Sequence, residues 1–426
     1  MSEIACGVDF GTSNSTIAFY RDNRLTLVPV ENEYTTIPSA LFFERIDNTP
    51  HYGREAVDLF TKRQKGRFMR SLKRVLGTSV MKQGTIVNGS QMNFSKIIGQ
   101  FIKNLKDKAE TVAQQEITQV VMGRPVHFID NDPIGNQNAQ EELRNIAKNV
   151  GFNTIDFQFE PIAAAFAHEL YVTGEKLALV VDIGGGTSDF TTIRLSKHFL
   201  GKTDRSDDIL ANMGIRIGGN DFDKNLSLQA FMPELGYRTT YGEKNLPVPL
   251  KFYYDLSEWS KINALYTPKN LMVLGQYLGQ SHDKPRLSKL VKVITQESGH
   301  ILLGAVEEAK IAVTTHEIYE SLLEFIENDF SIKTTKQVFE AAIEQEITKI
   351  LEAATQCVTE AGLSRLDIDL IILTGGSTEI PAVQLKFREL FPNATVSEEN
   401  KLDSVGVGLA YDSKRKFLSQ RLTTLF

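Results

Sequence analysis

The chain has 426 residues, a formal net charge of −6 and two cysteines, Cys6 and Cys357. The negative charge excludes a nucleic-acid protein held by bulk positive charge, and two cysteines exclude a disulfide framework. The length exceeds one ordinary core and predicts about two to four domains. The N-terminus, MSEIACGVDF, lacks the basic and apolar regions of a signal peptide. No apolar run approaches the ~20 residues of a membrane span, so we expect a cytoplasmic protein without membrane partners.

The first elements predict a hairpin with a glycine turn. Residues 4–10 and 16–20 favour strands, and the sequence Gly-Thr-Ser-Asn joins them. An acidic residue, Asp9, stands just before the turn. The stretch VVDIGGGTSDFTTI, residues 180–193, repeats this pattern around Asp182. The repeat predicts a duplicated domain with a cleft between its halves.

Strands and helices alternate between the two hairpins. ITQVVMGRPVHF predicts a buried strand ending at Pro125, and QEELRNIAKNVGF a helix closed by Gly151. IDFQFEPIAAAFAHEL runs from a strand into a helix, with Pro161 in its first turn. FSKIIGQFIKNLKDKAETV predicts a helix with one apolar face: Ile97, Ile98, Phe101, Ile102 and Leu105.

The part after the second hairpin contains one region with little periodicity. GIRIGGNDFDKNL predicts a strand and a turn before a helix, and IDLIILTGGSTEIP a buried strand, a Gly-Gly turn and a helix start. Residues 235–300 hold Trp259 and four prolines, and we interpret them as a variable subdomain. Their prolines are Pro247, Pro249, Pro268 and Pro285. The alternation of strands and helices predicts an α/β fold.

The hairpins suggest the domain boundaries. We expect lobe I at residues 1–180, lobe II at 181–395 and a C-terminal helix at 396–426 that returns to lobe I. Each lobe has a core and an added subdomain. In lobe I the core is residues 1–40 and 117–180, and the added subdomain is residues 41–116. In lobe II the core is residues 181–232 and about 332–395, and the variable subdomain is about 233–331.

The glycine turns point to phosphate binding. Phosphates accept hydrogen bonds from backbone N–H groups, and glycine allows close backbone approach. Asp9 and Asp182, each at a strand end beside such a turn, are candidates to hold Mg²⁺ directly or through its waters. One such turn alone is ordinary hairpin chemistry, but two copies and LTGGSTEIP favour a nucleotide site. The chain has no G-x-x-x-x-G-K-[ST] loop and no G-x-G-x-x-G opening a helix after a strand.

Seven motifs along the chain make the prediction of a nucleotide site more specific. In chain order they are GVDFGTSNS, RSLKRVLG, FEPIAAAFAHE, VVDIGGGTSDF, RIGGNDFD, EEAKIAV and LTGGSTEIP. The chain resembles the actin-like ATPase superfamily, and within it the ATPase domain of the DnaK-type heat-shock chaperone family. It is most similar to the short YegD-like members that lack a peptide-binding domain. The resemblance implies the actin-like fold, with two duplicated lobes around a nucleotide cleft.

The resemblance also implies roles for individual residues. Asp9 and Asp182 match metal-site residues, while Lys73, Glu160 and Thr187 match catalytic ones, Lys73 orienting the γ-phosphate and the attacking water. Pro125 matches a proline that helps to report the nucleotide state. The residues that match phosphate-binding positions are Gly11, Thr12, Ser13, Asn14, Gly184, Gly185, Gly186, Thr187, Gly218 and Gly219. Those that match the ribose and adenine edge are Glu307, Lys310 and Thr314, beside Gly375, Gly376 and Ser377.

Two of these residues have simpler interpretations when taken alone. Lys73 lies in a basic run, residues 62–74, which we interpret as a helix surface. Glu160 is an acid at a helix N-terminus, where the helix dipole favours it. The motifs around both residues favour the catalytic interpretation.

Three departures from the family pattern stand out. The chain ends where the ATPase domain ends, so we expect no peptide-binding domain. Glu141 stands where the chaperones carry an arginine. Ile311 and Glu379 stand where eukaryotic members place two arginines beside the base, which predicts an altered adenine site.

The sequence therefore predicts an ATP-binding, slowly hydrolysing, Mg²⁺-dependent ATPase with ATP/ADP and Mg²⁺ as cofactors. It would act as a chaperone-like protein with an unidentified protein partner. A nucleotide-dependent regulatory or filament-forming protein of the same fold is the alternative. A sugar kinase is the third possibility, although no acceptor site with a carboxylate base stands out.

Overall fold

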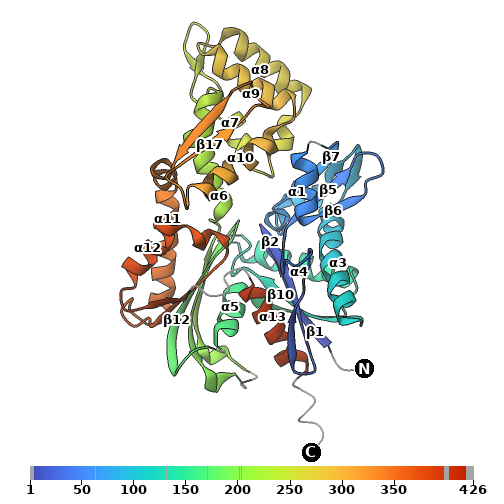
Figure 1. The fold of residues 1–426 in the computed structure, drawn as a ribbon, viewed down its shortest axis with the longest axis vertical. Coiled ribbons are helices and arrows are strands. Elements are labelled where there is room, and N and C mark those ends of the chain that lie inside the picture. The colour runs from blue at the N-terminus through green and yellow to red at the C-terminus, as the bar shows by residue number, and fades with distance from the viewer. Residues whose placement is uncertain are drawn as a thin grey trace, which may run out of the picture. The chain divides into compact units, whose positions relative to one another are not determined.

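The computed structural model describes residues 4–62, 64–129, 132–169, 171–200, 202, 204–397 and 403–418. Strands and helices alternate along the chain, which confirms the predicted α/β class (Figure 1). The chain divides into two compact units: Met1–Gly218 with Ile350–Glu379 and Val383–Phe426, and Gly219–Lys349 with Ile380–Ala382. Both glycine hairpins fall in the first unit. The predicted lobe boundaries stay a prediction.

The first sheet contains the first hairpin. Its strand order is β11–β10–β1–β2–β3, with β4 beside β2. β1 and β2 are antiparallel and place Asp9 opposite Thr16, whereas β10 and β11 continue the sheet in parallel. β1 is almost wholly buried, as expected for an apolar strand covered on both faces. The strands are β1 (Ile4–Phe10), β2 (Asn14–Arg21), β3 (Arg24–Leu27), β4 (Thr36–Pro38), β10 (Gln119–Arg124) and β11 (Thr154–Phe159).

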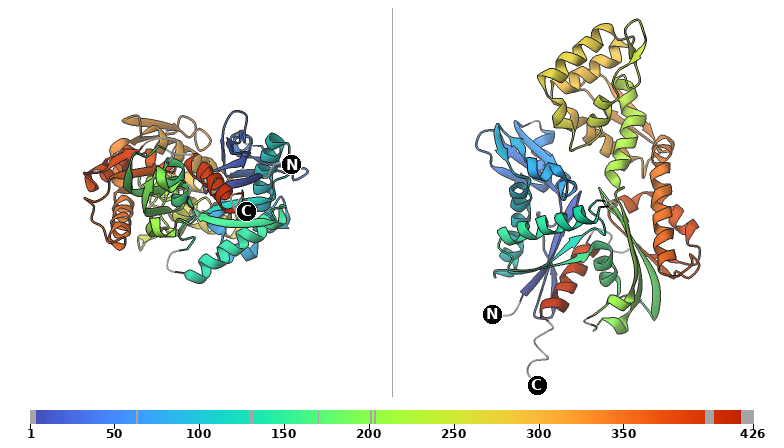
Figure 2. Two further views of the ribbon diagram at one scale, coloured as in Figure 1. Left: turned by 90° about the horizontal axis from the view of Figure 1, so that it is seen from below. Right: turned by 180° about the vertical axis from the view of Figure 1, so that it is seen from behind.

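The second sheet repeats this topology around the second hairpin (Figure 2, right, green). Its order is β14–β13–β12–β19–β20, with β12 and β13 antiparallel and β19 and β20 parallel to β12. In both sheets an antiparallel hairpin is followed by two parallel strands, which supports the predicted duplication. The strands are β12 (Glu175–Ile183), β13 (Ser188–Ser196), β14 (Ile209–Ile215), β19 (Leu370–Thr374) and β20 (Thr395–Ser397).

Two helices connect the sheets within this unit. α5 (Glu160–Glu169) contacts β12 and β13, and α13 (Ser404–Ser413) contacts β1, β2 and α5. Their crossing is close, because a Cβ at Gly408 would overlap the backbone of Ala163. α13 falls in the predicted C-terminal helix, of which residues 398–402 and 419–426 lie outside the described residues.

The helices that flank the first sheet have the predicted apolar face. α3 (Phe94–Ala113) buries Ile97, Ile98, Phe101, Ile102 and Leu105, which confirms that interpretation. It packs with α4 (Pro133–Asn149) against the first sheet. α4 ends before Gly151, whose φ of +99° matches the predicted glycine at the helix end.

The basic run at residues 62–74 is not a helix surface, so that prediction is wrong. Gly66–Arg70 forms β7, which pairs with β5 (Ala40–Glu44), and Leu72–Val75 forms a 3₁₀ helix. Phe68 and Met69 are buried between the charged residues. Pairing with a distant strand therefore overrides the helical propensity of the lysines and arginines.

The remaining elements of residues 41–116 are short. They are β6 (Pro50–Tyr52), α1 (Gly53–Thr61), α2 (Ser79–Gln83), β8 (Thr85–Val87) and β9 (Ser90–Met92). β6 and β7 flank β5, and α1 packs against β5.

The second unit is mainly helical. Two of the prolines in the region with little periodicity, residues 235–300, lie in the first turns of helices: Pro268 in α8 and Pro285 in α9. Thr267 and Asp283 cap these helices by accepting backbone N–H bonds from Asn270 and Arg286, both at 3.2 Å. The elements are α6 (Gly219–Leu226), β15 (Thr240–Tyr241), β16 (Leu246–Pro247), α7 (Lys251–Leu256), α8 (Pro268–Gln280), α9 (Lys284–Thr295), α10 (Gly299–Ala312), β17 (Ile318–Leu322) and β18 (Ser331–Thr335).

Two further helices belong to both units. α11 (Lys336–Glu360) and α12 (Pro381–Leu390) each contain a boundary between them. Across the described part of the chain, no helix is both long and apolar enough to span a bilayer.

The crossing of α5 and α13 gives a stability prediction. We expect Gly408→Ala to destabilise the protein by at least ~1–3 kcal/mol, because the new methyl group would overlap backbone rather than a movable side chain. Gly275→Ala in α8 is the control: a Cβ there has open space, so it should stabilise the helix by about 0.5–1 kcal/mol. Thermal unfolding measures both, and a Gly408→Ala protein as stable as the wild type would contradict the close crossing.

Candidate functional site

The two glycine turns come together in the first unit. A Cβ at Gly185 would overlap the hydroxyl of Ser13 and lie 3.4 Å from Cγ2 of Thr12. A Cβ at Gly186 would lie 3.1 Å from Oγ1 of Thr12. The turns predicted to bind phosphate therefore face each other, although they are far apart in the sequence.

Two further glycine segments adjoin the second turn. β19 ends at Thr374, opposite Asp182, and Gly375 follows with a φ of +82°. A Cβ at Gly375 would lie 2.6 Å from Oδ1 of Asp182. Gly218 approaches the turn from another side, since its Cβ would lie 2.7 Å from both the carbonyl oxygen of Gly184 and the amide nitrogen of Gly186. Bare backbone from several segments therefore converges here, which suits phosphate binding.

Side chains also link these segments. Ser377 donates its hydroxyl to the carbonyl oxygen of Gly184 at 3.2 Å, from the 3₁₀ helix Gly376–Glu379. The backbone N–H of Ser39 donates to the carbonyl oxygen of Ser13 at 2.8 Å and supports the first turn. Within this cluster Thr12 is buried, Gly11, Ser13 and Thr187 are partly exposed, and Asn14 is exposed.

Acidic side chains gather at the ends of the two hairpins. Burial and the charge of Glu160 raise the pKa values of Asp9 and Asp182 well above their usual range. Like charges in a buried site favour a cation. Mg²⁺ is usually held by one or two carboxylates together with water and substrate phosphates, which Asp9 and Asp182 fit. Among the described residues, no group of three or more His, Cys, Asp or Glu side chains is arranged to hold a metal ion.

Lys73 is the cation beside these carboxylates. Its ammonium forms an ion pair with the carboxylate of Glu160, and the two side chains are 6% and 9% exposed. Burial lowers the pKa of Lys73, but the carboxylates of Glu160 and Asp9 outweigh burial and raise its pKa overall. Lys73 is therefore charged and buried, unlike a solvated helix lysine.

Local structure fixes both partners of this pair. Lys73 lies in the 3₁₀ helix that follows Ser71, whose φ is +57°. Glu160 is the first residue of α5, directly after β11. Gly123 in β10 leaves room for it, since a Cβ there would lie 3.2 Å from Cγ of Glu160.

Asp189 is a residue of this site that the sequence reasoning missed. It lies opposite Asp182 in the β12–β13 register and accepts the backbone N–H of Val126 at 2.7 Å, directly after Pro125. Burial and Glu160 raise its pKa to about 7. The sequence feature that could have identified Asp189 is a carboxylate within the otherwise apolar and hydroxyl-bearing strand SDFTTI.

The other predicted residues lie in the second unit. Gly219 begins α6, while Glu307 and Lys310 lie on α10 and Thr314 just after it. Lys310 forms an ion pair with the buried Asp223 at 2.7 Å, and Thr314 donates its hydroxyl to the carbonyl oxygen of Ile311 at 2.6 Å. Their roles at the ribose and adenine stay predictions.

The two residues of the predicted altered adenine site, Ile311 and Glu379, are both exposed, and Gly376 is exposed near Glu379. Whether either side chain meets a base stays a prediction.

Comparison with protein families identifies the chain. The model of the family described as Hsp70 protein matches residues 5–236 and 294–414, which is more than half of the chain. The chain therefore belongs to the Hsp70 family. The ATPase domain of this family has the actin-like fold, which confirms the predicted fold, and its members bind ATP or ADP, generally with Mg²⁺. The unmatched residues 237–293 fall in the segment predicted to be variable.

A curated relative supports the same conclusion. The protein named "Chaperone protein HscA" from Buchnera aphidicola subsp. Baizongia pistaciae (strain Bp) is 25% identical over 422 residues. The similarity covers 93% of this chain and 68% of that protein. The chain is thus similar to a chaperone of this family over almost its whole length.

The buried pair predicts a stability effect that does not depend on nucleotide. We expect Lys73→Met to destabilise the protein by roughly 3–5 kcal/mol, because it leaves the buried carboxylate of Glu160 without its cation. The double variant Lys73→Met/Glu160→Gln should recover most of that loss, because the unpaired charge is gone. Urea unfolding of the two variants and of Glu160→Gln measures the coupling, and additive effects would argue against the ion pair.

Proposed function

We propose that this chain binds Mg²⁺-ATP at the converging glycine turns and hydrolyses it slowly to ADP and phosphate. The observation that carries the proposal is the meeting of the two turns beside the Lys73–Glu160 pair. Turns from two homologous hairpins offer backbone donors, and the pair supplies fixed charge. Membership of the Hsp70 family supports the same conclusion.

The roles of the binding residues follow from their chemistry. The backbone of residues 11–14 and 184–187 would hold the phosphates, with Gly218 and Gly375 allowing close approach. Asp9 and Asp182 would hold Mg²⁺, directly or through water. When bound, Mg²⁺ neutralises phosphate charge and polarises the transferred group.

The catalytic residues would act by position and charge. The ammonium of Lys73, fixed by Glu160, is placed to stabilise negative charge on the transferring phosphoryl group. Glu160 and Thr187 would orient the attacking water, Glu160 from the start of α5 and Thr187 from the second turn. Because the carboxylate of Glu160 is engaged in the ion pair with Lys73, we expect it to activate the attacking water weakly and hydrolysis to be slow.

A protein partner is part of the proposal. Members of the Hsp70 family bind client proteins as well as nucleotide, and the similar protein from Buchnera is named a chaperone. We propose that ATP binding and hydrolysis here set the conformation in which this chain engages its partner, without nucleic acid or membrane.

Nucleotide binding should stabilise the protein. Mg²⁺-ATP at ~100 times its dissociation constant should add about 2.7 kcal/mol to the unfolding free energy, because ligand binds only the folded state. The control is Gly218→Val, whose side chain would displace the backbone of the second turn. Thermal melts with millimolar Mg²⁺-ATP measure the shift, and no shift in the wild type would refute the proposed binding.

Lys73 should matter for hydrolysis more than for binding. We expect Lys73→Met to lower the turnover number by roughly 10²-fold or more, because such charge stabilisation has that size, while ATP still binds. Lys62→Met is the control, since Lys62 is exposed and its ion pair is with Asp58 on α1. Release of phosphate measures turnover below the melting temperature.

Three outcomes, measured by phosphate release, ADP release and sedimentation, would contradict the proposal or the role given to Lys73. Full turnover in Lys73→Met would show that Lys73 does not take part in hydrolysis. ADP release that requires an added sugar would indicate a kinase. ATP-dependent pelleting without hydrolysis would indicate a filament-forming protein.

A further inference from the structure

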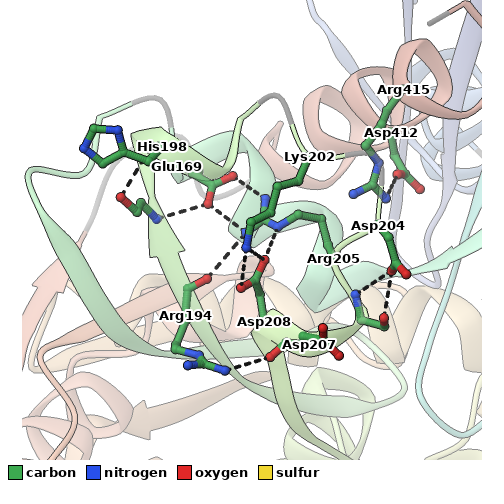
Figure 3. Close-up of polar contacts among 12 residues, drawn as sticks. Glu169, Arg194, His198, Lys202, Asp204, Arg205, Asp207, Asp208, Asp412 and Arg415 are labelled. Atoms are coloured by element: carbon green, nitrogen blue, oxygen red, sulfur yellow. Dashed lines mark hydrogen bonds and ion pairs between the residues drawn. The ribbon is translucent and has the colours of Figure 1, made fainter. Parts of the chain in front are cut away.

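A buried charged network lies at the end of α5 opposite to Glu160. Arg205, in the connection between β13 and β14, donates from its two terminal nitrogens to the carboxylate of Glu169 at 2.6 and 2.8 Å (Figure 3). Its Nε donates to Asp208 at 2.7 Å. The side chains of Arg205, Glu169 and Asp208 are 4%, 1% and 5% exposed. The last residue of α5 is thus fixed by a two-pronged ion pair.

The partners of Glu169 are themselves held in place. The backbone N–H of Ser196, at the end of β13, donates to Glu169 at 3.1 Å. Asp208 also accepts from Lys202 at 3.2 Å. A guanidinium satisfies two carboxylates in this way only when both have fixed positions, because its donors form a rigid planar fork. The network therefore defines where the end of α5 lies relative to the second sheet.

The middle of α5 is packed into the core of this unit but has mostly small side chains. Its middle consists of Ala163, Ala164 and Ala165, and α13 passes close to Ala163 at Gly408. Small residues give a smooth surface without deep ridges and grooves. The larger buried side chains of α5 between its ends are Ile162, Phe166 and His168. The ring centre of Phe166 lies 5.2 Å from the guanidinium of Arg205 and 4.9 Å from that of Arg415. Charged contacts thus hold the helix at both ends.

α5 is short and continuous between these ends. It has 10 residues, which corresponds to about 15 Å of helix. A displacement of Glu169 along the axis therefore carries Glu160 with it, and Glu160 is the partner of Lys73.

We propose that Arg205 is a positioning residue for the catalytic pair: by holding Glu169 it fixes α5 along its axis, and so places Glu160 against Lys73. The proposal rests on the proposed ATPase function for its kinetic consequence. A misplacement of about 1 Å in a catalytic group can cost roughly 10²-fold in rate.

The first test is Arg205→Met, which keeps length and removes charge. We expect its turnover number to fall roughly tenfold or more while its ATP dissociation constant stays within about twofold, because the phosphate turns are not part of the network. Arg54→Met is the matched control. Arg54 also pairs with a carboxylate, Glu31 at 2.7 Å, and also stacks on a ring, Tyr34 at 3.9 Å, and neither partner belongs to α5. Its turnover should equal that of the wild type.

A double variant separates positioning from stability. Glu169→Gln/Arg205→Met removes the unpaired buried carboxylate, and the new amide oxygen can still accept the N–H of Ser196. We expect the melting temperature to return toward the wild-type value while the turnover number stays low. Recovery of turnover together with stability, or wild-type turnover in Arg205→Met, would overturn the proposal.

Hydrogen exchange tests the proposal without hydrolysis. If the wild type releases no phosphate, the proposed function fails, but the mechanical link can still be measured. We expect faster amide exchange at residues 71–76 and 160–164 in Arg205→Met, and unchanged exchange there in Arg54→Met. Exchange in Arg205→Met that equals the wild type at these residues would overturn the positioning role by itself.

Discussion

The arrangement of the site depends on one buried cation among several carboxylates. Lys73 faces Glu160, and both lie near Asp9, Asp182 and Asp189. Burial and mutual repulsion raise the pKa values of the three aspartates. A site with this excess of carboxylates favours the binding of a cation. The cation reduces the electrostatic repulsion between the buried carboxylates. The same physical fact links the stability of the fold to the chemistry proposed for it.

The duplicated sheets explain why these carboxylates meet. In each sheet an antiparallel hairpin is extended by two parallel strands, and the acid stands at the hairpin's tip. Glycine is required where the two turns face each other, since a Cβ at Gly185 or Gly186 would contact Thr12 or Ser13. Duplication therefore produces two similar backbone surfaces, and the absence of side chains allows them to approach.

α5 connects the proposed catalytic end of the unit with a second polar centre. Its first residue takes part in the Lys73 pair and its last residue in the Arg205 network. The alanines between them permit the close passage of α13, which also packs on β1 and β2. In the Hsp70 family, nucleotide and client proteins are both ligands, and under the positioning proposal α5 is an element through which a distant surface could influence Glu160.

Local sequence patterns determined much of the fold. The two glycine hairpins, the apolar face of α3 and the proline at the start of α5 follow from turn chemistry and periodicity, which act within a few residues. The same patterns predicted that the turns bind phosphate and placed an acid at the tip of each hairpin. Other features were decided by tertiary structure alone. Lys73 is buried because it meets Glu160 across 87 residues, and the basic run around it becomes a strand because β5 pairs with it. Asp189 and Arg205 acquire their roles in the same way, since the groups that satisfy a buried charge are brought together by packing, whereas periodicity records only which face of an element is apolar.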